Sequence, residues 1–229
     1  MARSLGDRQA TVTIHYAQTL DGRIAARDGT SHWISCEESL QFAHQLRSQH
    51  DGVMVGVGTV LADDPRLTVR LVAGRSPARV IVDSTLRLPL SASVVSDGAA
   101  RTIVATTVRA DRAKTAVLME REVEIVQVKA DEDGRVDLVA LLGELPRLGV
   151  SSVLIEGGHS LITSALRRRI VGRLIVCVAP KILGTGVDAV GDIGTSRLGD
   201  ALVFSSLKTW QCGADLIVDG TLERVAAHV

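Results

Sequence analysis

Charged and hydroxyl side chains gather in residues 62–70, which read ADDPRLTVR. This stretch directly follows a short Val-rich segment that is typical of a buried strand, and we therefore expect it to be a loop at the edge of a sheet, where binding residues concentrate. The guanidinium of Arg70 can hold a phosphate through two parallel hydrogen bonds. A solvated turn with Asp–Arg ion pairs is the plainer alternative.

Glycines mark two other predicted strand ends. The sequence VGVGT, residues 55–59, places two spaced glycines before the hydroxyl of Thr59, and glycine lets the backbone approach a ligand closely. The sequence EGGHS, residues 156–160, joins a strand to a helix, and successive glycine amides at a helix start can bind an anion. Neither motif is a complete dinucleotide fingerprint or P-loop. A tight loop without a ligand stays open for the first motif, and a helix-capping or ion-paired role stays open for Glu156 in the second.

Metal and disulfide chemistry have no support in the sequence. The three cysteines, Cys36, Cys177 and Cys212, are odd in number and far apart, and no C-x-x-C occurs. No two of the six histidines have metal-ligand spacing with a carboxylate or thiol, so we expect no metal and expect these histidines to be structural or exposed. The serine-hydrolase motif G-x-S-x-G is also absent.

Composition limits the possible partners. The 229 residues carry 26 basic and 26 acidic side chains, and this balance provides no broad positive field for nucleic acid or an anionic membrane. Residues 1–9 are polar and unlike a signal peptide, and no apolar run reaches the roughly 18 residues of a membrane helix. We expect a cytoplasmic protein with reduced thiols, in which any anion is bound locally.

The elements that position these residues alternate between strand and helix. Strands are expected at about 11–18, 53–57, 78–82, 102–105, 123–128, 152–155 and 174–178, and helices at about 35–49, 110–119, 136–148 and 160–169. Ser35 and Glu38 have the spacing of a capping box. Residues 205–211 and 214–218 predict an antiparallel hairpin that turns at Cys212 and Gly213. The pattern predicts an α/β fold with a mainly parallel sheet flanked by helices, in a single domain of residues 1–229 with a flexible start at 1–10.

Several blocks of sequence, in this order, resemble the reductase domain of riboflavin biosynthesis, a family with a dihydrofolate-reductase-like fold. The blocks are AQTLDGRIA (17–25), SHWIS (31–35), LR (46–47), VGVGTVLADDPRLTVR (55–70), RVIVD (79–83), EGG (156–158) and APKILG (179–184). The usual Ser and Thr of two blocks are Thr19 and Ser35 here, and both keep a hydroxyl.

The resemblance implies a set of ligand-binding residues. Those for NADPH are Ala17, Trp33, Thr59, Asp63, Ser84, Gly158, His159, Ser160, Leu161, Ile162, Thr163 and Ser164. Those for the substrate are Ser31, Arg47, Leu67, Arg70 and Glu156. Arg47 and Arg70 would clamp a 5′-phosphate, and Asp63 or Glu156, or an ordered water, would supply the proton that the reaction needs. Thr106 and Thr107, which follow a predicted strand, are a further idea for the adenosine 2′-phosphate.

The implied reaction turns the ribosylamino group of a small phosphorylated pyrimidine into a ribitylamino group. The pyrimidine would be the diamino form or the amino-uracil form, and the sequence does not choose between them. The family often forms dimers, so we expect a homodimer. The zinc-ligand motifs of the deaminase that accompanies this domain in many bacteria are absent, so this chain should reduce and not deaminate. A dihydropterin-type reductase on the same fold and a non-catalytic nucleotide-binding module are the alternatives.

Overall fold

The computed structural model describes residues 9–31 and 34–223, and the chain divides into two compact units. The first unit comprises the described part of Met1–Thr11 together with His44–Leu154, and the second comprises the described parts of Val12–Ala43 and Ile155–Val229. Within these described residues, no helix has the length and hydropathy that crossing a bilayer requires.

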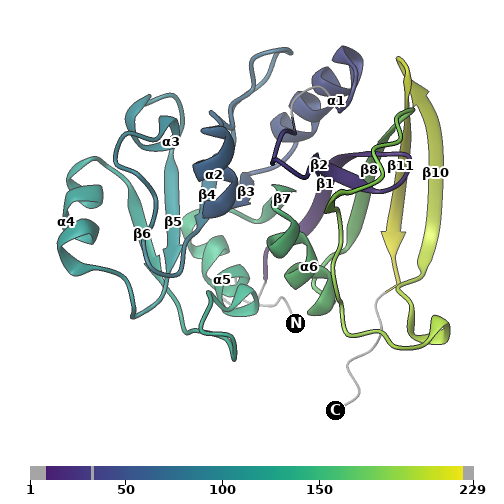
Figure 1. Ribbon diagram of the computed structural model, residues 1–229. Coiled ribbons are helices and arrows are strands. Elements are labelled where there is room, and N and C mark those ends of the chain that lie inside the picture. The colour runs from purple at the N-terminus through teal and green to yellow at the C-terminus, as the bar shows by residue number, and fades with distance from the viewer. Residues whose placement is uncertain (1–8, 32–33, 224–229) are drawn as a thin grey trace, which may run out of the picture. The chain divides into compact units, whose positions relative to one another are not determined.

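Four parallel strands form the sheet of the first unit. They are β3 (Gly52–Gly56), β4 (Ala78–Val82), β5 (Thr102–Thr106) and β6 (Glu124–Gln127), hydrogen-bonded in that order (Figure 1). All five residues of β5 are buried. Near-continuous Val and Ile runs are typical of parallel strands that are covered on both faces, which confirms the predicted sheet type.

The helices of the first unit follow its strands. They are α2 (Val57–Asp63), α3 (Ser93–Ser96), α4 (Arg112–Glu120) and α5 (Leu138–Glu144), and α5 continues into a 3₁₀ turn, η2 (Leu145–Leu148). Asp111 caps α4 by accepting the Lys114 N–H, and Asp137 caps α5 by accepting the N–H groups of Val139 and Ala140. These side-chain caps explain why α4 and α5 both start two residues later than predicted.

Helix α2 corrects one sequence prediction. We expected residues 55–59 to end a strand in a glycine loop, but β3 ends at Gly56 and the helix begins at Val57. Val57 and Val60 lie about one turn apart and are both buried. Their burial outweighs the low helix propensity of Gly58, which is why the glycines were misleading. Thr59 and Asp63 therefore lie on a helix and not in a loop.

The core of the first unit is aliphatic. Buried valines, leucines and isoleucines of β3, β4 and β5 form one cluster with residues of α2 and of the segment around α3, among them Leu86, Leu88 and Val94. Arg79 is also fully buried, and its Nη2 donates to both carboxylate oxygens of Asp97, at 2.7 and 2.9 Å. A buried guanidinium needs such a partner, so this ion pair fixes the end of α3 against β4.

The sheet of the second unit is mixed. β1 (Thr11–Thr19) pairs in parallel with β8 (Arg173–Ala179), β8 pairs antiparallel with β11 (Asp215–Leu222), and β11 pairs antiparallel with β10 (Phe204–Cys212) (Figure 1). The last pair confirms the predicted C-terminal hairpin, and Gly213 turns it with a φ of 57°. The hairpin extends four residues further than predicted, to Leu222.

Four further elements belong to the second unit or lead into it. β7 (Ser152–Gly157) brings the chain from the first unit into the second and is followed by α6 (His159–Arg167). β2 (Arg23–Ala26) and β9 (Gly186–Asp188) form a small antiparallel sheet that the sequence pattern did not predict, because strands of three or four residues leave little periodicity.

Helix α1 (Glu37–Ser48) starts later than the capping-box prediction. Glu38 is its second residue, so Ser35 lies too early to cap it, and the predicted capping box is wrong. The backbone N–H of Cys36, immediately before the helix, donates instead to the buried carboxylate of Asp215 at 2.8 Å. A contact made by a residue 179 positions away along the chain thus sets the helix start, and no local motif could reveal it.

Candidate functional site

Arg47 and Arg70, two predicted substrate residues of the first unit, both donate hydrogen bonds to Thr68. Nη1 of Arg47 donates to the carbonyl oxygen of Thr68 at 3.0 Å, and Nη1 of Arg70 donates to the Thr68 hydroxyl at 2.8 Å. The imidazole of His44 contacts both arginines: its Nδ1 accepts the Arg70 backbone N–H at 2.9 Å, and its Nε2 lies 3.5 Å from Nη1 of Arg47. We call His44, Arg47, Thr68 and Arg70 the cationic corner.

The electrostatics of the cationic corner favour an anion. Burial, and then the positive charges of Arg47 and Arg66, lower the pKa of Arg70, while the carboxylate of Asp97 acts in the opposite direction. Bringing like charges together costs free energy, and a bound anion offsets that cost. Guanidinium groups also match phosphate oxygens in geometry. The cationic corner is therefore a candidate phosphate site.

His44 and Thr68 are the residues of this corner that the sequence prediction missed. His44 precedes Arg47 by three residues on α1, a spacing that puts two side chains on the same helix face. That spacing was the available signal, but it does not show that the imidazole also reaches residue 70. Thr68 lies two residues before Arg70 in a segment without regular structure, where sequence periodicity says nothing about side-chain direction.

Leu67, the third predicted substrate residue of the first unit, has its side chain in the hydrophobic core. It is 3% exposed, belongs to the aliphatic cluster and has a φ of 52°. A non-glycine residue in this left-handed region is held there by its surroundings. Any contact of Leu67 with a ligand would have to come from its backbone.

The predicted cofactor residues of the first unit lie on α2 and just after β4. Thr59 is half-buried in α2, and Asp63 is exposed as its last residue. The next residue, Asp64, has a φ of 39°, and its carboxylate accepts the backbone N–H and the hydroxyl of Ser93. This anchor fixes the C-terminal end of α2 and so the position of Asp63.

Ser84 is held from both sides. Its hydroxyl oxygen accepts the Val136 N–H at 3.0 Å, and its carbonyl oxygen accepts the hydroxyls of Thr106 and Thr107. Both threonines are almost fully buried. The idea that they hold a 2′-phosphate is therefore wrong, since their hydroxyls are turned inward to the Ser84 carbonyl and position that residue.

In the second unit, most predicted cofactor residues lie at the start of α6. They are Gly158, His159, Ser160, Leu161, Ile162, Thr163 and Ser164. The side chains of Leu161, Ile162 and Thr163 are buried, and the Thr163 hydroxyl donates to the His159 carbonyl while accepting the Gly191 N–H. Nδ1 of His159 lies 2.7 Å from the carbonyl oxygen of Asp188. The side chains of His159, Leu161, Ile162 and Thr163 thus serve the unit itself, and the groups suited to an anion are the backbone amides of His159 and Ser160, the first two residues of the helix.

Gly158 makes this arrangement possible. It precedes the first residue of α6 with a φ of 87° and a ψ of 109°, and its carbonyl oxygen accepts the N–H groups of Leu161 and Ile162. A side chain is strained at such backbone angles, so the conformation itself requires glycine. The sharp entry leaves the backbone at the start of the helix without a covering side chain at position 158.

The remaining predicted residues of the second unit that the structure describes are half-buried. Ala17 is half-buried on β1 opposite Cys177 of β8. Ser31 is half-buried, and Glu156 is half-buried on β7, where it has interaction partners of its own. Trp33, predicted to bind the cofactor, lies outside the described residues.

Two of the sequence blocks that carry the resemblance, residues 17–25 and 179–184, are joined by hydrogen bonds. The Asp21 carboxylate accepts the Thr19 hydroxyl at 2.6 Å and the backbone N–H groups of Leu183 and Gly184 at 3.1 and 2.7 Å. These bonds, the Thr19 hydroxyl first, lower the pKa of Asp21 to about 2. Nε of Arg23 donates to the Gly184 carbonyl, and its guanidinium pairs with Asp188. These matched residues are therefore structural in the second unit.

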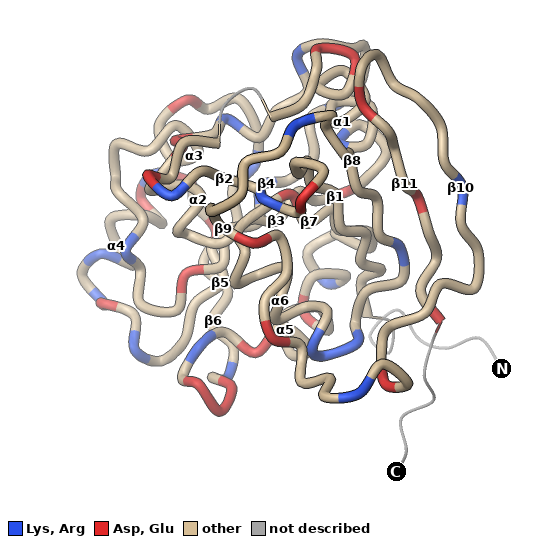
Figure 2. Tube along the Cα trace, turned by 45° about the vertical axis from the view of Figure 1, so that its right-hand side comes forward, with Lys and Arg blue, Asp and Glu red and all other residues tan. Residues whose placement is uncertain are grey.

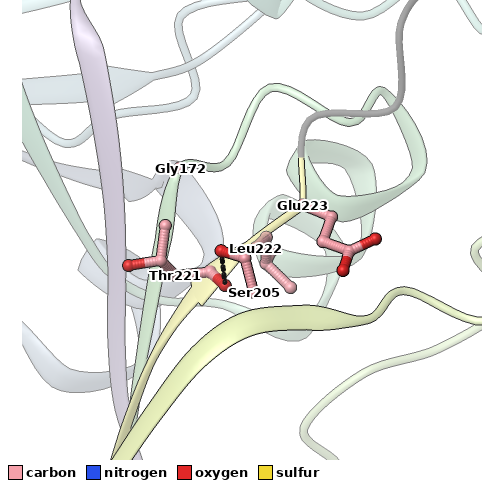
Figure 3. Close-up of a pocket in the computed structure, with 5 residues that line it drawn as sticks. All are labelled: Gly172, Ser205, Thr221, Leu222 and Glu223. Carbon is pink, nitrogen blue, oxygen red and sulfur yellow. Dashed lines mark hydrogen bonds between the residues drawn. The ribbon is translucent and has the colours of Figure 1, made fainter.

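Other features of the described chain lie apart from these residues. A pocket is lined by Gly172, Ser205, Thr221, Leu222 and Glu223, and none of them is a predicted ligand residue (Figure 3).

Lys and Arg are interspersed with Asp and Glu along the described chain, which agrees with the zero net charge (Figure 2). Among residues 9–31 and 34–223, no group of three His, Cys, Asp or Glu side chains has the arrangement of a metal site.

The fold defines the class of protein. An α/β chain with a mainly parallel sheet and a C-terminal antiparallel hairpin is similar to the dihydrofolate reductase of Enterococcus faecalis, with a TM-score of 0.52 over 94% of this chain. At 8% identity this likeness concerns the fold alone. The chain belongs to the family of the RibD C-terminal domain, whose family model matches residues 10–218.

Relatives and solved structures agree with this family. The chain is 40% identical to the 2,5-diamino-6-ribosylamino-4(3H)-pyrimidinone 5′-phosphate reductase of Methanothermobacter thermautotrophicus, over 93% of this chain and 98% of that protein. It is 38% identical to the riboflavin biosynthesis protein RibD of Aquifex aeolicus over 90% of this chain, but spans only 56% of that protein. The structure of RibD from Acinetobacter baumannii has a TM-score of 0.81 at 26% identity, over 94% of this chain and 59% of that one.

Proposed function

We propose that this chain uses NADPH to reduce the ribosylamino group of a pyrimidine 5′-phosphate to a ribitylamino group. The observation that carries this proposal is the cationic corner, in which Arg47 and Arg70 converge on Thr68. The relatives in question are named as reductases of such a phosphorylated pyrimidine, and the chain is 40% and 39% identical to two of them.

The cationic corner would bind the substrate's phosphate, which is remote from the reacting carbon. Two guanidinium groups held by one threonine present several N–H donors in a fixed direction. Anchoring this end of the substrate limits where its C1′ can lie, and restricting the reacting atoms in this way supplies a large part of an enzyme's rate. Ser31, Glu156 and the backbone of Leu67 would contact the rest of the substrate.

The residues at the start of α6 fit the phosphates of a dinucleotide. The backbone amides of His159 and Ser160 follow a glycine with a φ of 87°, and amides at a helix start bind phosphate in many proteins. Thr59 and Asp63 of α2, together with Ala17, Trp33 and Ser84, would contact the other parts of the cofactor. The chemistry that NADPH supplies when bound is a hydride for C1′.

The reaction also needs a proton at the nitrogen attached to C1′ or at the ring-opened sugar. Asp63 and Glu156 are the carboxyl groups that we assign to this step, with an ordered water as the alternative donor. Replacing each by its amide keeps the size and removes the proton. Both residues are also assigned to ligand binding, so the donor is identified as the residue whose amide variant loses much more kcat than the change in its KM accounts for.

A direct assay tests the proposal. Purified protein is incubated with NADPH and either the diamino or the amino-uracil form of the substrate, and loss of NADPH is followed with analysis of the product. Oxidation with one form supports the proposal and identifies the pyrimidine. Oxidation only with a dihydropterin would identify the alternative reductase, and tight binding of both ligands without oxidation would identify a binding module.

Removal of the Asp63 carboxylate should weaken cofactor binding. We expect Asp63→Ala to raise the KM for NADPH about tenfold, the usual effect of losing one charge-assisted hydrogen bond. Asp133→Ala, another exposed carboxylate of the first unit, is the matched control and should behave like the unmodified protein. Equal KM values for the two variants would remove Asp63 from the cofactor site.

We further propose that both units act as one reductase domain in a cytoplasmic homodimer, as is common in this family. Sedimentation equilibrium of the purified chain tests the dimer. A mass of 24.3 kDa, that of one chain, would contradict it.

A further inference from the structure

We propose that His44 is a positioning residue for phosphate binding: its imidazole fixes the backbone of Arg70 so that the guanidinium groups of Arg47 and Arg70 act on one anion. This inference rests on the proposed function, because it assigns a role within the cationic corner. His44 would not touch the substrate. It would act through Arg70, whose N–H it accepts at 2.9 Å.

The protonation of the imidazole follows from its partners. A backbone N–H can only donate, so Nδ1 of His44 must be unprotonated to accept it. In a neutral ring the proton is then on Nε2, which lies 3.5 Å from Nη1 of Arg47. Two N–H groups face each other there, so this contact packs the Arg47 side chain and adds no strong hydrogen bond. Because His44 is only 5% exposed, the ring is held in this orientation.

The need for such a residue lies in the segment that carries Arg70. Residues 64–77 contain no helix or strand, so no ladder of backbone hydrogen bonds positions them. Side chains do so at three consecutive residues. Arg47 donates to the carbonyl of Thr68, the Ser76 hydroxyl accepts the N–H of Val69, and His44 accepts the N–H of Arg70. Of these, only the His44 bond acts at Arg70 itself.

The contact at residue 70 matters for binding because of the direction of the side chain. The Arg70 guanidinium is tied to the Thr68 hydroxyl at 2.8 Å, and Arg47 is tied to the carbonyl of that same residue. If the Arg70 backbone shifts, its guanidinium group can no longer stay on Thr68, and the two guanidinium groups lose their shared partner. Mutual repulsion, which already lowers the pKa of Arg70, then favours their separation.

Three substitutions separate this role from simple packing. His44→Leu fills the space but removes the acceptor. His44→Asn places its carboxamide oxygen close to the position of Nδ1 and can still accept the Arg70 N–H, whereas His44→Gln places its amide group close to Nε2. We expect the KM for the phosphorylated substrate to rise about tenfold in the Leu and Gln variants and no more than about threefold in the Asn variant, with kcat nearly unchanged.

Two further measurements complete the test. The dephosphorylated substrate should show the same kcat/KM in all variants, since it does not use the cationic corner. Inorganic phosphate should raise the Tm of the unmodified protein and of His44→Asn, but much less that of His44→Leu and not that of Arg70→Ala. This thermal shift needs no catalysis, so it reports on the corner even if the assigned reaction is wrong.

The outcomes distinguish the two proposals. An unchanged KM and phosphate shift in His44→Leu, with both altered in Arg70→Ala, would overturn the role of His44 and leave the phosphate site standing. Equal losses in the Leu and Asn variants would also overturn it, since the acceptor would then be irrelevant. Unchanged values in Arg70→Ala would contradict the phosphate site of the proposed function itself.

Discussion

The cationic corner of the first unit and the start of α6 in the second unit are two candidate anion sites built in opposite ways. In the cationic corner, the donors are guanidinium groups of side chains, positioned by His44 and Thr68. At the start of α6, the side chains of Leu161, Ile162 and Thr163 are buried, and the candidate donors are the backbone amides of His159 and Ser160. The first site is therefore determined by side-chain chemistry, and the second by backbone conformation.

Because the two candidate sites are built differently, they should tolerate different substitutions. A side-chain site loses its donors when one residue changes, and it also depends on the residues that hold that side chain. A backbone site keeps its donors when side chains change, and it fails when a residue can no longer adopt the required φ and ψ. Substitutions in the two regions should accordingly affect different ligands and in different ways.

The largest effect is expected from Arg70→Ala. It removes a charge-assisted bidentate donor, so the KM for the phosphorylated substrate should rise about 100-fold while the KM for NADPH stays within about twofold. For Arg70→Lys, the KM for the phosphorylated substrate should lie between those of the unmodified protein and of Arg70→Ala, because lysine keeps the charge but not the planar fork. Arg147→Ala, an exposed arginine paired with Glu144, is the surface control. A change in both KM values would show that the ligands do not use separate sites.

Gly158→Ala should have the next largest effect, and on the other ligand. A Cβ at a φ of 87° forces the backbone before α6 to move, so the KM for NADPH should rise about tenfold while that for the substrate is unchanged. Gly143→Ala is the matched control, because Gly143 lies in α5 with open space around its Cα and no left-handed angle. Normal NADPH kinetics in Gly158→Ala would contradict the backbone site.

A smaller effect concerns Asp21, an anion that backbone amides of the second unit already bind. The Thr19 hydroxyl and the N–H groups of Leu183 and Gly184 lower its pKa to about 2, against an ordinary value of 3.8. A depressed carboxyl pKa contributes stability above the unfolded value, and this contribution is lost as the pH falls toward 2. Asp21→Asn should therefore lower Tm at pH 6, and the difference from the unmodified protein should shrink on acidification. A difference independent of pH would contradict this assignment.

The smallest effect is expected from Ser160→Ala. Ser160 is exposed in the first turn of α6, and its backbone amide, not its hydroxyl, is assigned to the cofactor. The KM for NADPH should therefore stay within about twofold of the unmodified value. A tenfold rise would show that the hydroxyl binds, and the contrast between the two regions would then be weaker than we infer.

Much of the fold was accessible from the sequence because local patterns determine it. Val-rich runs predicted β3, β4 and β5 within a residue or two, and the alternating tail predicted the hairpin of β10 and β11. The errors lie where distant contacts decide. α2 forms despite Gly58 because Val57 and Val60 are buried, and α1 starts after Cys36 because Asp215 accepts the N–H of that residue.

The candidate site divides in the same way. Arg47, Arg70 and the glycines of residues 156–158 could be identified from residue type, order and resemblance, since the chemistry of a guanidinium or a glycine belongs to the residue itself. The inward orientation of Leu67, Leu161 and Ile162 could not, because burial depends on neighbours that are distant in sequence. Thr106 and Thr107 illustrate the same limit, since only the structure shows their hydroxyls on the carbonyl of Ser84.

From the sequence came the resemblance to the family, most strands and helices of the two larger sheets, and the residue types that can bind phosphate. Only the three-dimensional structure shows that Arg47 and Arg70 share Thr68, that His44 accepts the Arg70 backbone N–H, and that Leu161, Ile162 and Thr163 of α6 are buried. The physical reason is range: propensity and periodicity act over a few residues, whereas hydrogen bonds of a loop without regular structure join residues 21 and 26 positions apart. Those two bonds fix the Arg47 guanidinium and the Arg70 backbone, and so bring the positive charges of the cationic corner together.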